Sequence, residues 1–282
     1  MNVDKISRFI SDLLLSLKSL IKIVLLSRKD TITRANDNND KIIVMGNGPS
    51  LTNTINNDFK ALSTNPTLAV NFAANAPEFK KLRPRYYLIA DPHFYSSCDN
   101  PAVNRLTQNL SSVNWEMTLF LPVKARHSAL AHCNENIKIE YFNPIGIEGF
   151  NWLENFAFSH GWGMPRPRNV LIPAIMIGAR LGYKQIFIAG ADHSWMRTIS
   201  VNDNNEVVSI QPHFYKDDES EQQRINIEYL KHPLHKIIHS FYIAFSAYHT
   251  IQRYATSCGI KIYNSTPESF IDAFPRAPLP KQ

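Results

Sequence analysis

The sequence predicts an α/β protein with a mostly parallel, doubly wound sheet, preceded by an amphipathic helix and carrying a lid insertion. From residue 41 onward, short apolar runs alternate with stretches of helical periodicity, which is typical of parallel sheets with helices on both faces. Polar residues follow four of these runs, at Asn47, Asn71, Asp91 and Asp192. Because ligands bind such sheets beyond the carboxyl ends of the strands, we expect a site there in a Rossmann-like domain.

The first forty residues differ from the rest of the chain. Residues 1–29 repeat apolar side chains at helical spacing, interrupted by charges such as Arg8, Asp12 and Lys22. They predict an amphipathic helix that is too charged to span a bilayer. Two interpretations stay open: the helix packs on the domain or on another subunit, or it lies on the inner membrane surface. Residues 30–40 are rich in Asn and Asp and indicate a linker.

Composition narrows the class of partner only partly. The 282 residues carry a net charge of +6 and three cysteines without metal-type spacing. The cysteines favour a reducing cytoplasm over a disulfide framework. The charge by itself fits an anionic ligand, an anionic membrane surface or nucleic acid, and does not choose among them. We expect no nucleic-acid partner, and a homo-oligomer stays open.

The domain is expected to span residues 41–282, and its elements follow the hydrophobic pattern. Residues 143–167 show no clear period, and residues 194–226 are polar and long enough to be a lid. Strands are expected at 41–45, 67–71, 86–90, 117–121, 138–141, 185–189 and 260–263. Helices are expected at 51–62, 76–82, 104–109, 125–133, 169–181 and 233–257.

The turn after the first strand is the best candidate for a phosphate site. Gly46 and Gly48 permit positive φ and close backbone approach, and Ser50 can cap the next helix. A helix start offers free N–H groups and a positive dipole end to a phosphate. A plain strand–turn–helix corner is the alternative, since the spacing is neither a dinucleotide fingerprint nor a P-loop.

Three stretches carry a family resemblance. Residues 42–51 are similar to the opening of the bacterial sialyltransferases of glycosyltransferase family 42. Residues 181–192 resemble the second signature of that family, and residues 259–263 resemble its last strand. The resemblance implies a single domain with a lid, a CMP-sugar donor and metal-independent inverting transfer with a histidine base. It implies donor-binding roles for Gly46, Asn47, Gly48, Pro49, Ser50, Asn71, Asp91, Arg168, Gly190, Asp192 and Tyr215.

The same opening, with residues 69–71 and 87–92, also resembles the 6-hydroxymethylpterin diphosphokinase-like family, which occurs among surface-polysaccharide proteins. Asp91 stands where the sialyltransferases have asparagine, and in a diphosphokinase-like enzyme it would bind Mg²⁺. Ser194 replaces an expected tyrosine, for which Tyr215 could substitute. Arg166 and Arg168 flank the position of an expected arginine.

A histidine base is the other expectation from the resemblance. His239 is the closest match to that position and His235 is the second choice, one helical turn away. Imidazole titrates near neutral pH, as activation of a sugar hydroxyl requires. Alternatively, both histidines are structural or solvated, or they form a metal pair, although no third ligand is evident.

The sequence therefore predicts a glycosyltransferase that needs no cofactor and acts at the inner membrane surface. It would move a sugar, such as sialic acid or a related nonulosonic acid, from a CMP-sugar to a surface-glycan acceptor. One alternative is a Mg²⁺-dependent diphosphotransferase with Asp91 on the metal. Another is a non-catalytic nucleotide-binding partner in polysaccharide assembly.

Overall fold

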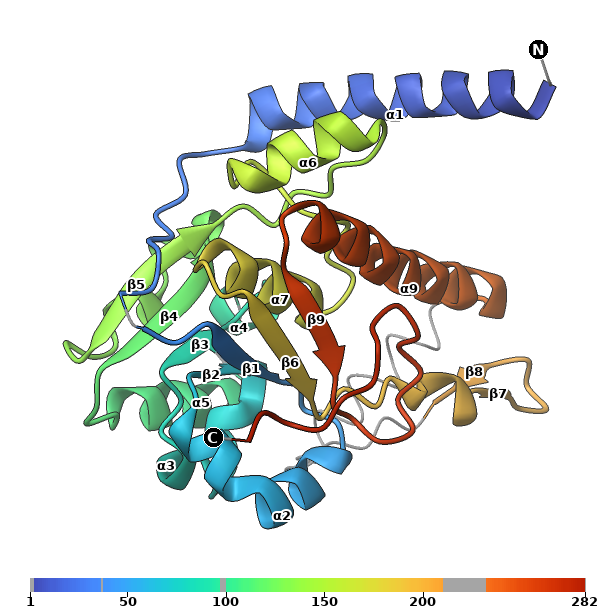
Figure 1. Ribbon diagram of the computed structural model, residues 1–282. Helices are drawn as coiled ribbons and strands as arrows, with labels where there is room; N and C mark the ends of the chain where they lie inside the picture. The colour runs from blue at the N-terminus through green and yellow to red at the C-terminus, as the bar shows by residue number, and fades with distance from the viewer. Residues whose placement is uncertain (1–2, 37, 97–99, 210–231, 282) are drawn as a thin grey trace.

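The fold is built on one parallel sheet (Figure 1). The computed structural model describes residues 3–36, 38–96, 100–209 and 232–281. Within them, seven parallel strands lie in the order β5-β4-β3-β2-β1-β6-β9. The strands are β1 (Lys41–Met45), β2 (Thr67–Val70), β3 (Tyr86–Leu88), β4 (Met117–Pro122), β5 (Ile137–Phe142), β6 (Gln185–Ala189) and β9 (Lys261–Asn264). The strand order reverses between β1 and β6, so the predicted Rossmann-like α/β fold is confirmed.

Both faces of the sheet are buried, which explains why its strands read as continuous apolar runs. Ile42 and Val44 of β1 join the core that includes α7 (Leu171–Arg180) and α9 (Leu234–Ser257). Ile43 and Met45 point to the other face, where α2 (Ser50–Thr64) and α5 (Pro101–Ser111) pack. The alternation follows from the two-residue period of a strand.

Two segments differ from the prediction. Residues 125–133 were expected to form a helix, but they hold the short 3₁₀ turns η2 (Val123–Ala125) and η3 (Ala129–His132). The stretch 143–167 contains α6 (Asn151–Ser159), which the pattern missed. Trp152 and Phe156 of α6 are exposed whereas Leu153 is buried, so apolar side chains surround this helix and hide its period. The remaining short helices are η1 (Asn71–Asn75), α3 (Phe79–Leu82) and α4 (His93–Ser96).

The start of the chain lies against the domain. Helix α1 (Val3–Leu26) runs over α6 and extends past it (Figure 1). The segment predicted to be a linker follows β5: the Thr31 amide donates to the Tyr141 carbonyl at 3.1 Å, and the Thr33 hydroxyl donates to Glu140 at 2.6 Å. Residues 31–33 are thus hydrogen-bonded to the edge of the sheet.

The region predicted to be a lid is described only up to residue 209. It holds η4 (Ser194–Arg197) and an antiparallel hairpin of β7 (Ser200–Val201) and β8 (Val207–Val208). Val207 of the hairpin packs on Ile237 and Phe241 of α9. Residues 210–226, with Tyr215, lie outside the described residues.

A search of the described helices for a possible membrane span gives none: no helix combines the length and the apolar character required.

Candidate functional site

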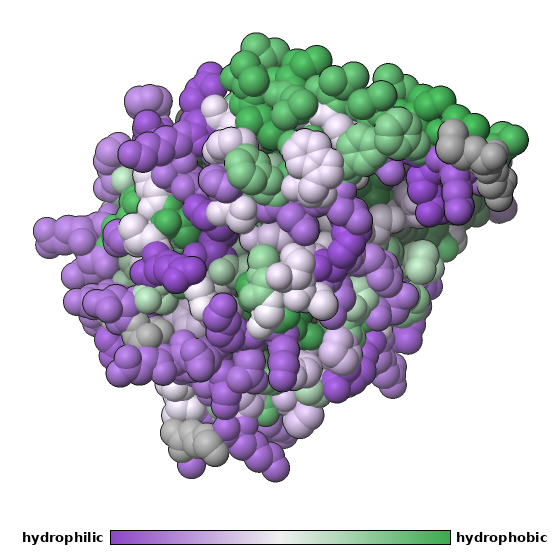
Figure 2. All heavy atoms as spheres, turned by 45° about the horizontal axis from the view of Figure 1, so that its top comes forward, coloured by the Kyte–Doolittle hydropathy of each residue, from purple (hydrophilic) through white to green (hydrophobic). Residues whose placement is uncertain are grey.

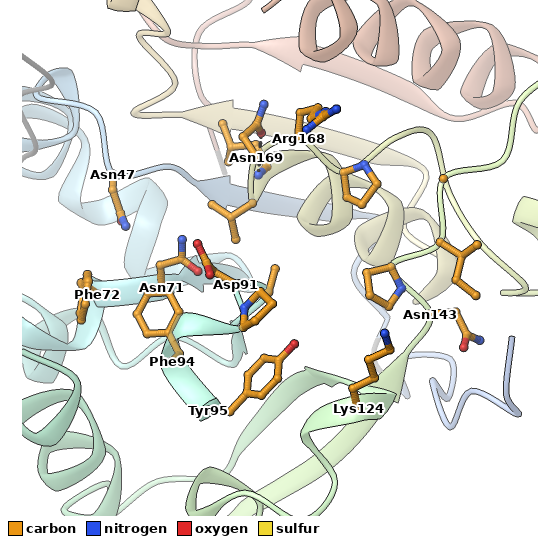
Figure 3. Close-up of a pocket in the computed structure, with 18 of the residues that line it drawn as sticks. Asn47, Asn71, Phe72, Asp91, Phe94, Tyr95, Lys124, Asn143, Arg168 and Asn169 are labelled. Carbon is orange, nitrogen blue, oxygen red and sulfur yellow. Dashed lines mark hydrogen bonds between the residues drawn. The ribbon is translucent and has the colours of Figure 1, made fainter. Parts of the chain in front are cut away.

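A cavity of about 930 Å³ lies at the carboxyl ends of the strands (Figure 3). Its wall is formed by the loops after the six strands β1 to β6, by the segment entering α7, and by the end of α1. Parallel strands end at one edge of a sheet, so residues far apart in sequence meet there. The predicted site residues in this wall are Asn47, Gly48, Pro49, Asn71, Asp91, Arg168, Gly190 and Asp192. Gly46, Ser50, His235 and His239 are not part of it.

The glycines after β1 have a structural role that differs from the prediction. Neither Gly46 nor Gly48 has positive φ, whereas Gly190 after β6 does, at 67°. A Cβ on Gly46 would lie 2.4 Å from the Gly190 carbonyl oxygen, and one on Gly48 would lie 2.0 Å from Oδ2 of Asp192. The close approach that these glycines allow therefore joins the β1 and β6 turns to each other.

The first turn of α2 is likewise occupied by the protein itself. Asp192 Oδ2 accepts hydrogen bonds from Ser50 Oγ at 2.7 Å and from the Ser50 amide at 3.3 Å. Ser50 does not cap α2, since the residue at the cap position is Pro49. A phosphate at this helix start would meet the Asp192 carboxylate, which disfavours the phosphate position expected there.

Three half-buried asparagines carry side-chain atoms that have no hydrogen-bond partner among the described residues. They are Oδ1 of Asn47, Oδ1 of Asn71 and Nδ2 of Asn169. Asn47 is held by Nδ2, which donates to the Val70 carbonyl at 3.1 Å. Asn71 begins η1 with φ of 48°, and its carbonyl accepts the Tyr87 hydroxyl proton. Buried polar atoms are normally paired, so two unpaired acceptors and one unpaired donor on residues of the cavity wall indicate a site for a polar ligand.

Four cationic side chains line the cavity, namely Lys22, Arg28, Lys124 and Arg168. Of the two arginines considered for the site, Arg168 lines the cavity, whereas Arg166 Nε is paired with Glu148 at 2.6 Å. Burial lowers the pKa of Lys22, whose Nζ donates to the Gly146 carbonyl at 2.7 Å. Figure 3 shows Lys124 across the cavity from Asn47 and Asn71. The cations suit an anionic ligand.

Asp91 is the acid that follows β3, and its carboxyl group points into the cavity in Figure 3. Its Oδ1 accepts the His93 amide proton at 2.9 Å, which ties the loop to α4. Burial first, and the charge of Asp91 second, raise the pKa of the nearby Tyr95 hydroxyl. Across the described ranges, no three His, Cys, Asp or Glu side chains gather as a metal site.

The sequence places His193 beside Asp192 at the end of a strand without assigning it a catalytic or donor-binding role, and the structure places it in the cavity wall. Its Nε2 is 2.6 Å from the Tyr248 hydroxyl, which donates to Asn169 Oδ1 at 2.9 Å. Because the hydroxyl has one proton, Nε2 must be the donor, and Nδ1 is left as an acceptor. Burial lowers the pKa of His193 to about 3, so the ring is neutral near pH 7. The pair Tyr248–His193 thereby orients Asn169.

His235 and His239 are exposed on the first turns of α9. The ring of His239 lies 6.2 Å from that of Tyr242 and is not in the cavity wall. The structure therefore does not bring these histidines together with the residues at the strand ends.

Comparisons with known proteins bear on the fold. No model of a known protein family matches the chain, and no curated protein matches it significantly. Among solved structures, it is similar to the MAf glycosyltransferase from Magnetospirillum magneticum AMB-1, with 10% identity and a TM-score of 0.50 over 89% of this chain. A mammalian sialyltransferase matches with 11% identity and a TM-score of 0.34, over 82% of this chain and 84% of that one.

The chain has a glycosyltransferase-like fold, which the first of these likenesses shows. It spans 35% of the length of the MAf glycosyltransferase. At such low identity the likeness concerns the fold and does not extend to membership of glycosyltransferase family 42.

Proposed function

We propose that the protein is a glycosyltransferase that binds a nucleotide-activated sugar in the cavity at the strand ends. The observation that carries the proposal is the set of unpartnered amide atoms on Asn47, Asn71 and Asn169, three residues from three loops that line one cavity. A nucleotide sugar offers hydroxyls and base edges that would satisfy them. Its phosphate would lie near Arg168, where a guanidinium can bind two phosphate oxygens at once.

For the proton acceptor we favour Asp91 over His239, because only Asp91 lies in the cavity wall. Its carboxylate would take the proton of the acceptor hydroxyl while that oxygen attacks the anomeric carbon. The bond from that carbon to the phosphate oxygen breaks, and the phosphate leaves with its electron pair. Arg168 would stabilise the charge that develops on the leaving phosphate.

The finer assignment rests on the sequence resemblance. The donor we propose is a CMP-activated nonulosonic acid such as sialic acid, and the acceptor is a surface glycan. Glycan assembly on this donor would take place at the inner face of the membrane, which the basic, amphipathic α1 favours.

The diphosphotransferase is the second candidate, because two carboxylates, Asp91 and Asp192, line the same cavity. In that case Asp91 would be the residue that holds Mg²⁺, and the ion would neutralise part of the phosphate charge of ATP. The Asp192 carboxylate already accepts two hydrogen bonds from Ser50, so Asp91 is the better ligand of the two.

Thermal stabilisation by CMP, UDP, GDP and ATP, each with and without Mg²⁺, tests the assignment. We expect CMP to stabilise the protein without metal. Stabilisation by ATP alone, and only with Mg²⁺, would favour the diphosphotransferase, and no stabilisation by any nucleotide would favour a non-catalytic role.

The matched variant is Asn71→Gly. Asn71 has φ of 48°, which glycine adopts readily, so the variant removes the amide without straining the backbone. Asn205 has φ of 60° in the exposed turn of the β7–β8 hairpin, which makes Asn205→Gly the control. We expect Asn71→Gly to abolish the shift by CMP and Asn205→Gly to retain it. Equal shifts in both would remove Asn71 from the donor site.

A further inference from the structure

Helix α1 turns its apolar side away from the domain. The residues it buries are Ser16 and Ser19, whereas Leu14 is 61% exposed, Ile21 59% and Val24 78%. An amphipathic helix on a monomeric protein normally buries its apolar side. Among the described residues, Phe9 contacts the ring of Phe150 at 5.4 Å and Ile23 packs on the core, but most apolar side chains of α1 remain exposed.

Hydrogen bonds hold the helix in this orientation. The Phe150 amide donates to Ser16 Oγ at 2.9 Å, and Ser19 Oγ both accepts from the Glu148 amide at 2.9 Å and donates to its carbonyl at 2.8 Å. Between them, Gly149 has φ of 129°, and a Cβ there would lie 2.2 Å from Ser16 Oγ. The contact therefore needs both the serine and the glycine, and rolling the helix over would break every one of these bonds.

Helix α6 and the turn after it extend the apolar surface with aromatic side chains. Trp152 and Phe156 of α6 are exposed, and Trp162 packs edge-on against Phe156 at 5.3 Å. Figure 2 shows the green surface of this region as a continuous band along one side of the molecule. Exposed patches of this extent mark interaction sites, and tryptophan is enriched where proteins meet the lipid–water interface.

The charge on α1 identifies the occupant. Helix α1 carries four lysines and arginines against two aspartates, and Arg28, Lys29 and Asp30 follow it. An apolar stripe flanked by excess positive charge fits anionic lipid headgroups above an acyl layer. A second copy would instead bring the same positive charge against itself.

The apolar surface also reaches the cavity. Lys22, Leu25, Leu26 and Arg28, from the end of α1 and the turn after it, line the cavity wall. Whatever α1 rests on is therefore next to the cavity in which an acceptor would bind.

We propose that the exposed face of α1 and α6 docks on an anionic bilayer and holds the cavity against the membrane surface, so that the acceptor is a lipid-anchored glycan. The docking is independent of the reaction, and the nature of the acceptor rests on the proposed function.

Co-sedimentation of the full chain with phosphatidylcholine vesicles, with and without phosphatidylglycerol, tests the docking. The variant is Leu14→Glu/Ile21→Glu, since both side chains are exposed and glutamate is a good helix former. The control, Phe59→Glu/Ile238→Glu, changes two exposed apolar residues on α2 and α9. We expect wild type and control to bind the anionic vesicles with a blue shift of tryptophan fluorescence, and the variant to bind at least tenfold more weakly.

Other results would overturn the docking. Equal binding by the variant and the control would remove α1 from the interface, and equal binding to neutral and anionic vesicles would remove the role of charge. If wild type fails to bind vesicles and sediments as a dimer that Leu14→Glu/Ile21→Glu dissociates, a second copy covers the face.

The placement of the cavity needs a separate measurement. In a variant with its three cysteines changed to serine, a fluorophore on Lys124→Cys reports the cavity, and one on Lys60→Cys reports the exposed side of α2. We expect nitroxide-headgroup lipids to quench the first and spare the second. Equal quenching would contradict the proposed orientation. Stabilisation of the unlabelled wild type by CMP is measured without vesicles, so a failed donor site and a failed membrane contact give different patterns.

Discussion

Asp192 and Ser50 join the two turns that flank the point where the strand order reverses. Oδ2 of Asp192 accepts both the hydroxyl proton of Ser50, at 2.7 Å, and its amide proton, at 3.3 Å, across 142 residues of sequence. A carboxylate at a helix start interacts favourably with the free N–H groups and the positive dipole end. The first turn of α2 therefore already has a carboxyl partner from the protein itself, and we expect an external phosphate to bind away from it.

Ser50→Ala tests this relationship. Removing the hydroxyl should lower the free energy of unfolding by about 1–3 kcal/mol, because it deletes a hydrogen bond to a charged group. Nucleotide affinity should change little. Ser63→Ala, which removes an exposed hydroxyl bonded to the Lys60 carbonyl, should stay within about 0.5 kcal/mol of wild type in urea denaturation. Loss of nucleotide binding at unchanged stability would mean that Ser50 contacts the ligand.

Gly46→Ala is expected to destabilise the fold by about 1–3 kcal/mol, since its methyl group would overlap the Gly190 carbonyl. Gly178→Ala in α7 is the matched control. Its Cβ would have neighbours at 3.4 Å and beyond, and alanine is the better helix former, so it should be neutral or stabilising by up to about 1 kcal/mol. Thermal denaturation compares the two, and equal melting temperatures would show that the β1 and β6 turns can separate freely.

We expect His193 to lower the free energy of unfolding at acidic pH. Burial lowers its pKa from 6.5 to about 3, so between these values the unfolded chain binds a proton that the folded chain does not. The free energy of unfolding should then fall as pH drops through this window, by up to about 1.4 kcal/mol per pH unit from this group. His193→Gln keeps a donor for Tyr248 and cannot titrate. Urea denaturation at several pH values should show a shallower slope for the variant, and identical slopes would contradict a buried neutral ring.

Asp91→Asn and His239→Ala separate the two candidates for the base. We expect Asp91→Asn to lower turnover by about 10²–10⁴-fold with donor affinity retained, and His239→Ala to keep a near-native rate. Turnover of a CMP-sugar and CMP affinity, measured in parallel, check this. The reverse pattern would restore His239 as the base, and loss of both activity and Mg²⁺ dependence in Asp91→Asn would favour the diphosphotransferase.

Local patterns were sufficient to predict the sheet. The strand expected at residues 185–189 is β6 as observed. A strand that is buried on both faces forms a continuous apolar run, which can be recognised in the sequence without knowledge of the neighbouring strands. The sequence also predicted that Asn47, Asn71 and Asp91 would lie together in one site, because parallel strands end at a common edge of the sheet. Helix α6 escaped detection because Trp152 and Phe156 face outward and blur its period.

The partners across long sequence distances depended on the tertiary structure. Nothing local to Gly48 indicates that Asp192 will occupy the space beside it, or that Tyr248 will hold His193 and thereby Asn169. The glycines in the sequence indicate that another group packs closely against the β1 turn. The tertiary structure shows that this group is the backbone and the Asp192 carboxylate of the β6 turn.

Helix α1 shows most clearly which features depend on the local sequence and which depend on the tertiary structure. Its sequence by itself determined an amphipathic helix with excess positive charge, because periodicity and composition are local properties. Which side faces the domain was decided by the tertiary structure. The backbone groups of residues 148–150 need polar partners, Ser16 and Ser19 supply them, and the apolar side is therefore turned outward beside the cavity.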